Sequence, residues 1–191
     1  METTIFGPPG TGKTTRLIEI VQQELDSGTR PESIAFVSFS RKAAEEAQER
    51  AAAKLHMDVN QMVWFRTLHS FAFQMLGLQV KQVLGGKDYS KLGGLLGLEF
   101  TSNSSATMAE GILFRPGKSG DAYLSIIQMV RVRGVSIEQQ FNDVADRRLH
   151  YQQLKLVDQV FRDYKKETGK VDFVDMIEDF IEQGDSPLLD V

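Results

Sequence analysis

The sequence contains no cysteine and only three histidines among its 191 residues. Disulfide bonds and cysteine-based metal sites are therefore excluded, and this composition suits a reducing compartment. His56, His69 and His150 lie far apart in the sequence, which argues against a zinc site. No apolar run approaches the length of a membrane span, and the six residues before Gly7 leave no room for a signal peptide. We therefore expect a cytoplasmic protein with no membrane partner.

The chain also lacks an excess of positive charge, since its formal net charge is −4. Residues 171–191 carry seven acidic residues and no basic ones, and without them 22 Lys and Arg residues stand against 19 Asp and Glu residues. Even so, no dense basic stripe is visible. Binding to nucleic acid must therefore be argued from specific residues and not from bulk charge.

The most informative motif is the glycine-rich segment Gly7–Thr15, GPPGTGKTT, which fits the pattern G-x-x-x-x-G-K-[ST] of P-loop NTPases. Residues 3–6 before it are predicted to form a short buried strand, and residues 15–21 after it a helix. A strand, a glycine-rich turn and a helix are the context that this motif needs. The alternative is a glycine-rich turn that binds nothing, which these flanks disfavour.

The residues of this loop have separate expected roles. Gly10 and Gly12 let the backbone curl so that its N–H groups approach a phosphate. Lys13 is expected to reach the β- and γ-phosphates, and Thr14 to place its hydroxyl on Mg²⁺, so that these two are the candidate catalytic residues and Thr14 the candidate metal ligand. The full set predicted to bind nucleotide is Gly7, Pro9, Gly10, Thr11, Gly12, Lys13, Thr14 and Thr15.

The first 76 residues show a βαβαβα pattern, which is typical of a parallel α/β sheet. After the first strand and helix, residues 33–39 and 61–65 are predicted strands, and residues 41–55 and 71–76 predicted helices. Ligands of such sheets bind beyond the carboxyl ends of the strands. The P-loop, the segment Phe39–Lys42 and the segment Thr67–Ser70 each follow a strand, so they should line one edge.

The character of the chain changes after residue 76. Residues 77–120 are rich in glycine and are predicted to form loops and short helices. Four helices are predicted after this segment. The first covers residues 121–133 and is ended by Gly134, and the second begins with a capping box at Ser136. The other two cover residues 151–166 and 172–181. Residues 188–191 resemble the beginning of a strand.

Taken singly, two polar segments favour structural roles. Phe39 is expected to be a core residue, with Arg41 and Lys42 at a solvated helix start, although an exposed Phe39 could stack on a base. An isolated histidine such as His69 is more often a hydrogen-bonded structural residue than a base or ligand.

Considered together, these motifs resemble superfamily 1 DNA helicases of the UvrD/Rep/PcrA type. Gly7–Thr15 is similar to helicase motif I, and SFSRKAA from Ser38 resembles motif Ia, usually TFTNKAA. The segment TLHSF from Thr67 resembles motif Ib, and VDFVDMI from Val171 the segment shortly before motif II. All four occur in the order found in the family. The resemblance covers residues 3–76 and about 150–191.

This resemblance implies the fold, the cofactors and the partner. It implies an α/β P-loop NTPase fold with a RecA-like parallel sheet flanked by helices. Residues 1–76 and 150–191 would form the 1A core, and residues 77–149 a mostly helical insertion like subdomain 1B. It implies ATP and Mg²⁺ as cofactors and single-stranded DNA as a partner. The residues implied in DNA contact are Phe39, Ser40, Lys42, Thr67, His69 and Ser70.

The sequence departs from the family pattern at both ends. The glutamine segment that usually reads adenine has no room before the P-loop, and the chain stops at Val191, ahead of the acidic motif II. We therefore expect the N-terminal portion of an ATP-dependent helicase that binds nucleotide and DNA without appreciable hydrolysis. Its partner would be the missing C-terminal half or a complementing chain.

Two other functions stay open. A complete small P-loop kinase would need a carboxylate base, for which Asp172 and Asp175 are the candidates. A non-catalytic nucleotide-binding or DNA-binding module that assembles with a partner is the second.

Overall fold

The computed structural model describes residues 3–101, 118–144, 146 and 148–184. The chain divides into two compact units, one reaching to Phe71 and the other starting at Ala72, and each is described by itself. In the described part of the chain, no helix combines the length and the apolar character that crossing a membrane requires.

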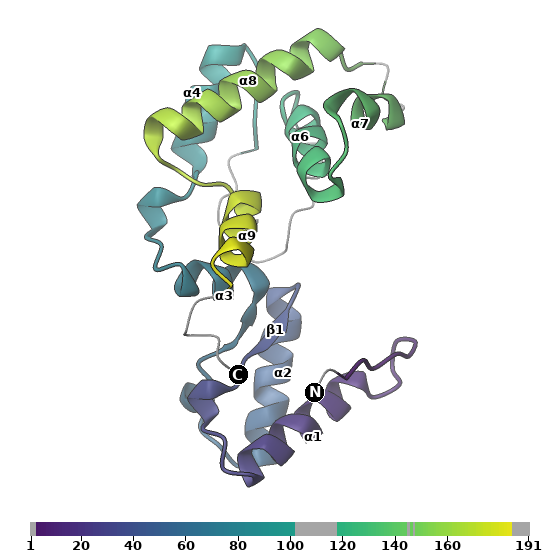
Figure 1. The fold of residues 1–191 in the computed structure, drawn as a ribbon, viewed down its shortest axis with the longest axis vertical. Coiled ribbons are helices and arrows are strands. Elements are labelled where there is room, and N and C mark those ends of the chain that lie inside the picture. Colours follow the sequence, from purple (N-terminus) through teal and green to yellow (C-terminus); the bar gives the residue numbers. More distant parts are fainter. Residues whose placement is uncertain (1–2, 102–117, 145, 147, 185–191) are drawn as a thin grey trace. The chain divides into compact units, whose positions relative to one another are not determined.

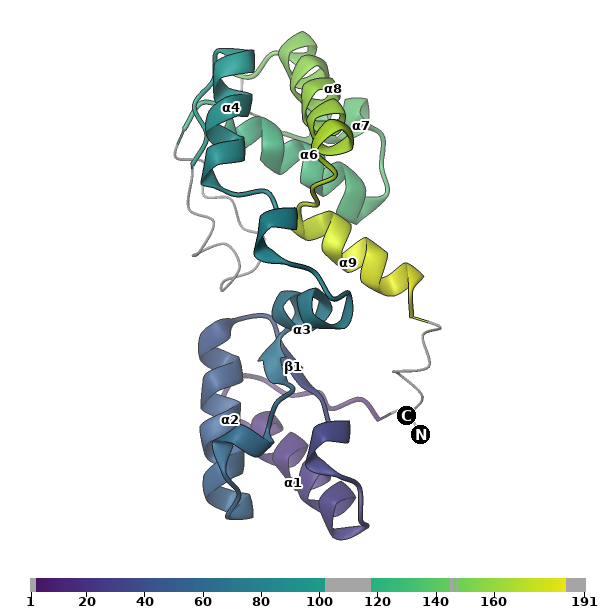
Figure 2. The same cartoon turned by 90° about the vertical axis from the view of Figure 1, so that its left-hand side faces the viewer.

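The first unit is a small α/β unit. Strands β1 (Phe36–Ser38) and β2 (Phe65–Thr67) pair in parallel, with Phe36 opposite Phe65 and Ser38 opposite Thr67. Helices α1 (Lys13–Asp26) and α2 (Arg41–Leu55) pack against each other, and α2 also contacts both strands (Figures 1 and 2). Short 3₁₀ helices η1 (Pro31–Ser33) and η2 (Val59–Gln61) precede the strands. The core between helices and sheet is formed by Ile18, Val21, Ala47, Ala51, Met62 and Phe65.

Helix α2 has the predicted bounds because its sequence combines a capping serine with a strongly helix-forming body. The side chain of Ser40 accepts a hydrogen bond from the Ala43 N–H, which caps the first turn. The alanine-rich body has high helix propensity and buries Ala44, Ala47 and Ala51. His56, with a φ of 51°, ends the helix in the left-handed conformation.

All three expected strands differ from the structure. The strand expected over 33–39 is shortened to β1, because η1 includes Ser33 and the ladder covers only Phe36–Ser38. Residues 3–6 are not a strand: they join no sheet, and the Phe6 side chain is 90% exposed, so the segment lacks the neighbouring strand that pairing requires. The strand expected over 61–65 is instead β2, shifted toward the carboxyl end. Asp58 accepts the Asn60 N–H and thereby starts η2, which occupies the start of the expected strand. The prediction of an α/β chain with a parallel sheet is confirmed in coarse form, whereas the described residues form two strands and not a RecA-like sheet.

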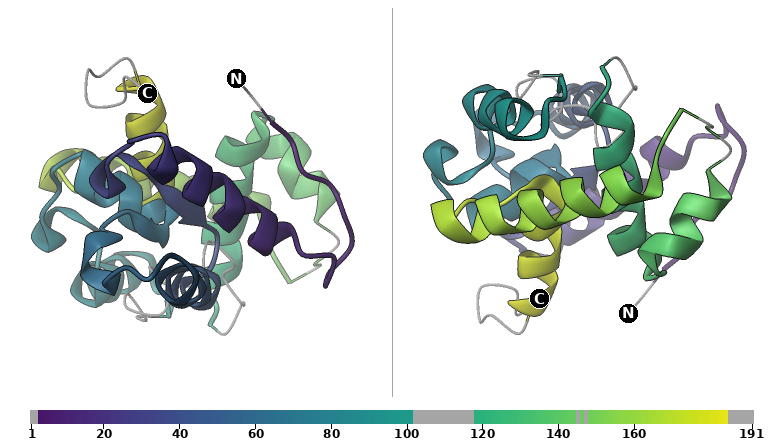
Figure 3. Two further views of the ribbon diagram at one scale, coloured as in Figure 1. Left: turned by 90° about the horizontal axis from the view of Figure 1, so that it is seen from below. Right: turned by 90° about the horizontal axis from the view of Figure 1, so that it is seen from above.

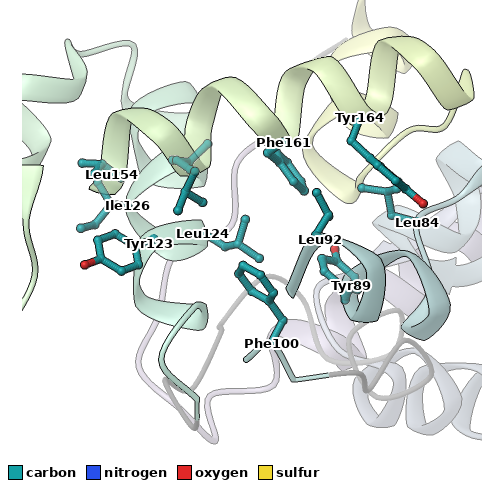
Figure 4. Packing of buried hydrophobic residues seen from close by; sticks show 12 residues of the cluster. Leu84, Tyr89, Leu92, Phe100, Tyr123, Leu124, Ile126, Leu154, Phe161 and Tyr164 are labelled. Atoms are coloured by element: carbon teal, nitrogen blue, oxygen red, sulfur yellow. The ribbon is translucent and has the colours of Figure 1, made fainter. Parts of the chain in front are cut away.

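Helix α3 (Leu68–Met75) follows β2 without a loop. The second unit is helical. It contains η3 (Val80–Gln82), α4 (Gly86–Leu96), α6 (Asp121–Arg133), α7 (Ile137–Asp143), α8 (Tyr151–Thr168) and α9 (Phe173–Glu182). Helix α8 lies across α6, as the view from above shows (Figure 3). Leu92, Leu124 and Phe161, from α4, α6 and α8, point toward one another in the core (Figure 4).

Most helix ends in this unit agree with the predictions. Helix α6 begins at Asp121 and ends at Gly134, which has a φ of 62°. Ser136 caps α7, and Asp172 caps α9. Residues 188–191 lie outside the described residues. The assignment of residues 1–76 and 150–191 to one domain and 77–149 to an insertion stays a prediction.

Candidate functional site

The glycine-rich segment forms a turn that leads directly into α1. Gly10 and Gly12 have φ angles of 82° and 81°, which L-residues with side chains rarely adopt. At Gly7, a Cβ would lie 2.5 Å from the Thr11 hydroxyl oxygen, so a larger residue there would displace the Thr11 side chain. Two glycines of the motif, Gly10 and Gly12, are therefore explained by the backbone geometry of the loop.

The Lys13 ammonium closes the loop. Its Nζ donates hydrogen bonds to the carbonyls of Gly7, at 2.6 Å, and Pro8, at 2.7 Å. The Thr11 hydroxyl donates to the Pro8 carbonyl at 2.8 Å. The Lys13 ammonium therefore lies at the centre of the loop. Its partners are carbonyl groups, which an anionic ligand does not bind.

The start of α1 is suited to a phosphate group. Its N-cap is Gly12, which has no side chain that could accept a bond from the first N–H groups of the helix. The first turn contains no acidic residue. The N–H groups at this end and the helix dipole favour an anion. Thr14 and Thr15 stand in this first turn beside Lys13. The loop therefore fits a nucleotide's phosphates, with the Thr14 hydroxyl as the group that would hold Mg²⁺.

The segment after β1 presents an aromatic ring and a cation. The Phe39 side chain is 84% exposed, so it is not a core residue of this unit. Ser40 is engaged as the cap of α2 through its side chain, and Lys42 is exposed in the first turn of that helix. Arg41 is exposed as well and pairs with Glu45 at 2.8 Å.

The segment after β2 presents polar groups in a different setting. Thr67 is buried, and its hydroxyl oxygen accepts the Ser70 N–H at 3.2 Å, which caps the start of α3. His69 and Ser70 are half-buried in the first turn of that helix. Burial lowers the pKa of His69, so its imidazole is neutral at physiological pH.

The parallel pairing of β1 and β2 brings these two segments to the same edge of the sheet. Ser38 lies opposite Thr67 at the last position of the ladder, so the chain leaves both strands at that edge. This confirms the expected proximity of the two segments. The glycine-rich loop is not joined to them through the sheet, because residues 3–6 do not pair with either strand.

The structure adds one residue that the sequence did not single out. Arg66 lies in β2 opposite Val37, and its guanidinium NH1 group is 3.4 Å from the Ser70 hydroxyl oxygen. A single arginine in a strand carries no motif. Only the register of the two strands and the start of α3 could have indicated its position.

The two carboxylates considered for a kinase are engaged elsewhere. Asp172 accepts the N–H groups of Val174 and Asp175 and pairs with Arg131 and Lys165. Asp175 also pairs with both cations. Burial opposes ionisation of Asp175, but the hydrogen bonds from Lys165 and the Asp172 N–H keep its pKa below the usual value. Both groups therefore have the bonding of structural residues, which tie α6 and α8 to the start of α9.

Comparisons with known proteins agree with the motifs. A family model described as the UvrD/REP helicase N-terminal domain matches residues 1–190. An ATP-dependent DNA helicase PcrA from Leuconostoc citreum is 37% identical over 76 residues, which cover 38% of this chain and 10% of that protein. The chain thus matches about a tenth of the length of this relative. No solved structure matches significantly.

Proposed function

Because the chain belongs to the UvrD/REP helicase N-terminal domain family, we propose that it provides the ATP-binding and single-stranded-DNA-binding parts of an ATP-dependent DNA helicase. The observation that carries this proposal is the shared edge of β1 and β2. Phe39 directly follows Ser38, which pairs with Thr67, so the exposed Phe39 and the segment Thr67–Ser70 both follow strand ends at this edge. A motor that moves along DNA of any sequence needs aromatic rings that stack on bases and polar groups that contact the DNA backbone. It does not need contacts to base edges.

The glycine-rich loop would bind the phosphates of ATP. Lys13 would exchange its bonds to the Gly7 and Pro8 carbonyls for phosphate oxygens, which are stronger acceptors for an ammonium. The N–H groups at the start of α1 would face the same oxygens. Mg²⁺, when bound, neutralises the phosphate charge, and Thr14 would orient it.

The sheet edge would bind the DNA strand. Phe39 would stack on a base, which contributes about 1–3 kcal/mol per base in such sites. Lys42 would supply positive charge for a phosphate. Thr67 and Ser40 already cap the helices that follow, so they would hold the edge in shape while His69 and Ser70 offer hydrogen bonds.

Movement along DNA and strand separation are proposed for the whole protein. ATP hydrolysis would need the acidic motif and the second RecA-like domain that the family uses, supplied by a C-terminal half or a complementing chain. Residues 1–76 and 150–191 would belong to the core in that assembly, and residues 77–149 would be its insertion.

Equilibrium binding of a fluorescently labelled oligothymidine tests the proposal. The Phe39→Ala variant should bind at least about fivefold more weakly than the natural sequence, since one stacked base is lost. Phe6→Ala is the matched control, because Phe6 is an equally exposed phenylalanine of the same unit outside the sheet. Equal affinity of Phe39→Ala and Phe6→Ala would contradict the assignment of the edge.

A further inference from the structure

We propose that Arg66 is a further phosphate-binding residue of this edge and that it also positions the Ser70 hydroxyl. The inference rests on the proposed function, because it assumes a nucleic-acid strand at the carboxyl ends of β1 and β2. It adds a residue that the motif comparison does not include and assigns it to the backbone of the strand and not to its bases.

Arg66 stands on the sheet face that is turned away from the core. On one face, Phe36 and Phe65 stack with ring centroids 5.1 Å apart, and Phe65 is part of the core. Because side chains alternate along a strand, Arg66 and its cross-strand partner Val37 belong to the opposite face. Val37 is 40% exposed, so this face is open to solvent within the unit.

The guanidinium of Arg66 is held near Ser70 by its neighbours. Its Nε donates to the Val63 carbonyl at 2.6 Å, and its NH1 lies 3.4 Å from the Ser70 hydroxyl oxygen. The ring of Trp64 lies beneath it, with the guanidinium carbon 6.0 Å from the centroid. Trp64 is itself fixed, since its indole N–H donates to the Glu32 carbonyl at 2.8 Å. The side chain is therefore directed toward the start of α3.

The charge of Arg66 is not neutralised within its unit. Among residues 3–71, Arg16, Arg41, Arg50 and Lys54 each pair with a glutamate. No carboxylate of these residues lies within 4.0 Å of the Arg66 guanidinium. A half-buried guanidinium without a carboxylate favours an anion, and its planar pair of N–H groups matches two phosphate oxygens.

The contact with Ser70 indicates how the two residues would act together. A guanidinium N–H can only donate, so at Ser70 it faces the lone pairs of the hydroxyl oxygen. The hydroxyl proton then points away from the arginine and is available to a phosphate oxygen. The guanidinium has further N–H groups that neither Val63 nor Ser70 uses, so it can donate to the same phosphate while it keeps its place beside Ser70.

The experiment measures how the affinity of the full chain for labelled oligothymidine changes with salt. Arg66→Gln removes the charge and keeps an amide donor, and Arg66→Lys keeps the charge and loses the planar fork. Arg30→Ala is the matched control, because Arg30 is an exposed arginine that precedes η1 and β1, at the opposite ends of the strands. Far-ultraviolet circular dichroism reports whether each variant retains its helices, because Arg66 lies over Trp64 and its replacement would change the tryptophan fluorescence by itself.

We expect Arg66→Gln to weaken binding by roughly tenfold and to reduce the slope of log affinity against log salt by about 0.7, as loss of one phosphate contact predicts. Arg66→Lys should retain the slope with weaker binding, and Arg30→Ala should leave both unchanged. If Phe39→Ala weakens binding but Arg66→Gln matches Arg30→Ala, Arg66 has no such role while the proposed function stands. If the natural sequence does not bind the oligonucleotide, both are overturned.

Discussion

Ser38 and Thr67 face each other at the last position of the parallel ladder, and each uses its hydroxyl to shape the turn that follows. The Ser38 hydroxyl oxygen accepts the Ser40 N–H at 3.2 Å, and the Thr67 hydroxyl oxygen accepts the Ser70 N–H at 3.2 Å. Both strands therefore end at one sheet edge, and a helix follows each of them. The exposed Phe39 lies in the first of these turns, which is why this edge is the candidate DNA interface.

The Lys13→Ala variant should bind Mg²⁺-ATP at least about tenfold more weakly than the natural sequence. The physical reason is the loss of charge-assisted hydrogen bonds to phosphate, which contribute about 1.5–3 kcal/mol each. A fluorescent ATP analogue titrated in the presence of Mg²⁺ measures the change. Lys54→Ala is the control, because Lys54 pairs with Glu19 on the helix surface, away from the loop. Unchanged affinity in Lys13→Ala would contradict the phosphate assignment.

The stability of the first unit should fall as the pH drops below about 6.5, because burial lowers the pKa of His69 in the folded state. Between the lowered folded pKa and the unfolded value, the unfolded state binds more protons, so the free energy of unfolding rises with pH. Urea unfolding followed by Trp64 fluorescence at pH 7.5 and 5.5 measures this dependence. The His69→Gln variant should show a smaller change in the free energy of unfolding between pH 7.5 and 5.5. An equal change in the variant and in the natural sequence would show that His69 is not the source of the pH dependence.

Asp172→Ala should lower the free energy of unfolding of the second unit by about 2–4 kcal/mol. The change removes the cap of α9 and one of the two carboxylates that pair with both Arg131 and Lys165, so that Asp175 alone remains between these cations. Unfolding followed by circular dichroism measures the loss. Asp163→Ala is the control, because Asp163 is exposed on α8, and it should change stability by less than about 0.5 kcal/mol. Full stability of Asp172→Ala would return this residue to the kinase hypothesis.

The helices could be predicted because their ends are encoded locally. Ser40 starts α2, Gly134 ends α6, and Asp172 starts α9. In each case one residue satisfies backbone groups a few positions away, and such signals are visible in the sequence. The glycine-rich loop before α1 was equally clear, since its positive φ angles require glycine.

The strands and the salt-bridge cluster depend on partners that are distant in sequence. Residues 3–6 have a strand-like composition, but composition does not supply a neighbouring strand. Arg131 meets Asp172 across 41 positions, and no local pattern indicates that pairing. The same holds for Arg66, whose place beside Ser70 follows from the cross-strand register and the start of α3.

Photo-crosslinking tests the central claim, that DNA binds at the edge formed by β1 and β2, most directly. A single-stranded oligonucleotide carrying a halogenated uracil would be irradiated with the full chain, and the attached tryptic peptides identified by mass spectrometry. We predict crosslinks in the peptide that ends at Arg41 and contains Phe39, and in the peptide from Thr67 to Lys81. Crosslinks that lie only in the second unit, with none at Phe39 or at the start of α3, would contradict the account.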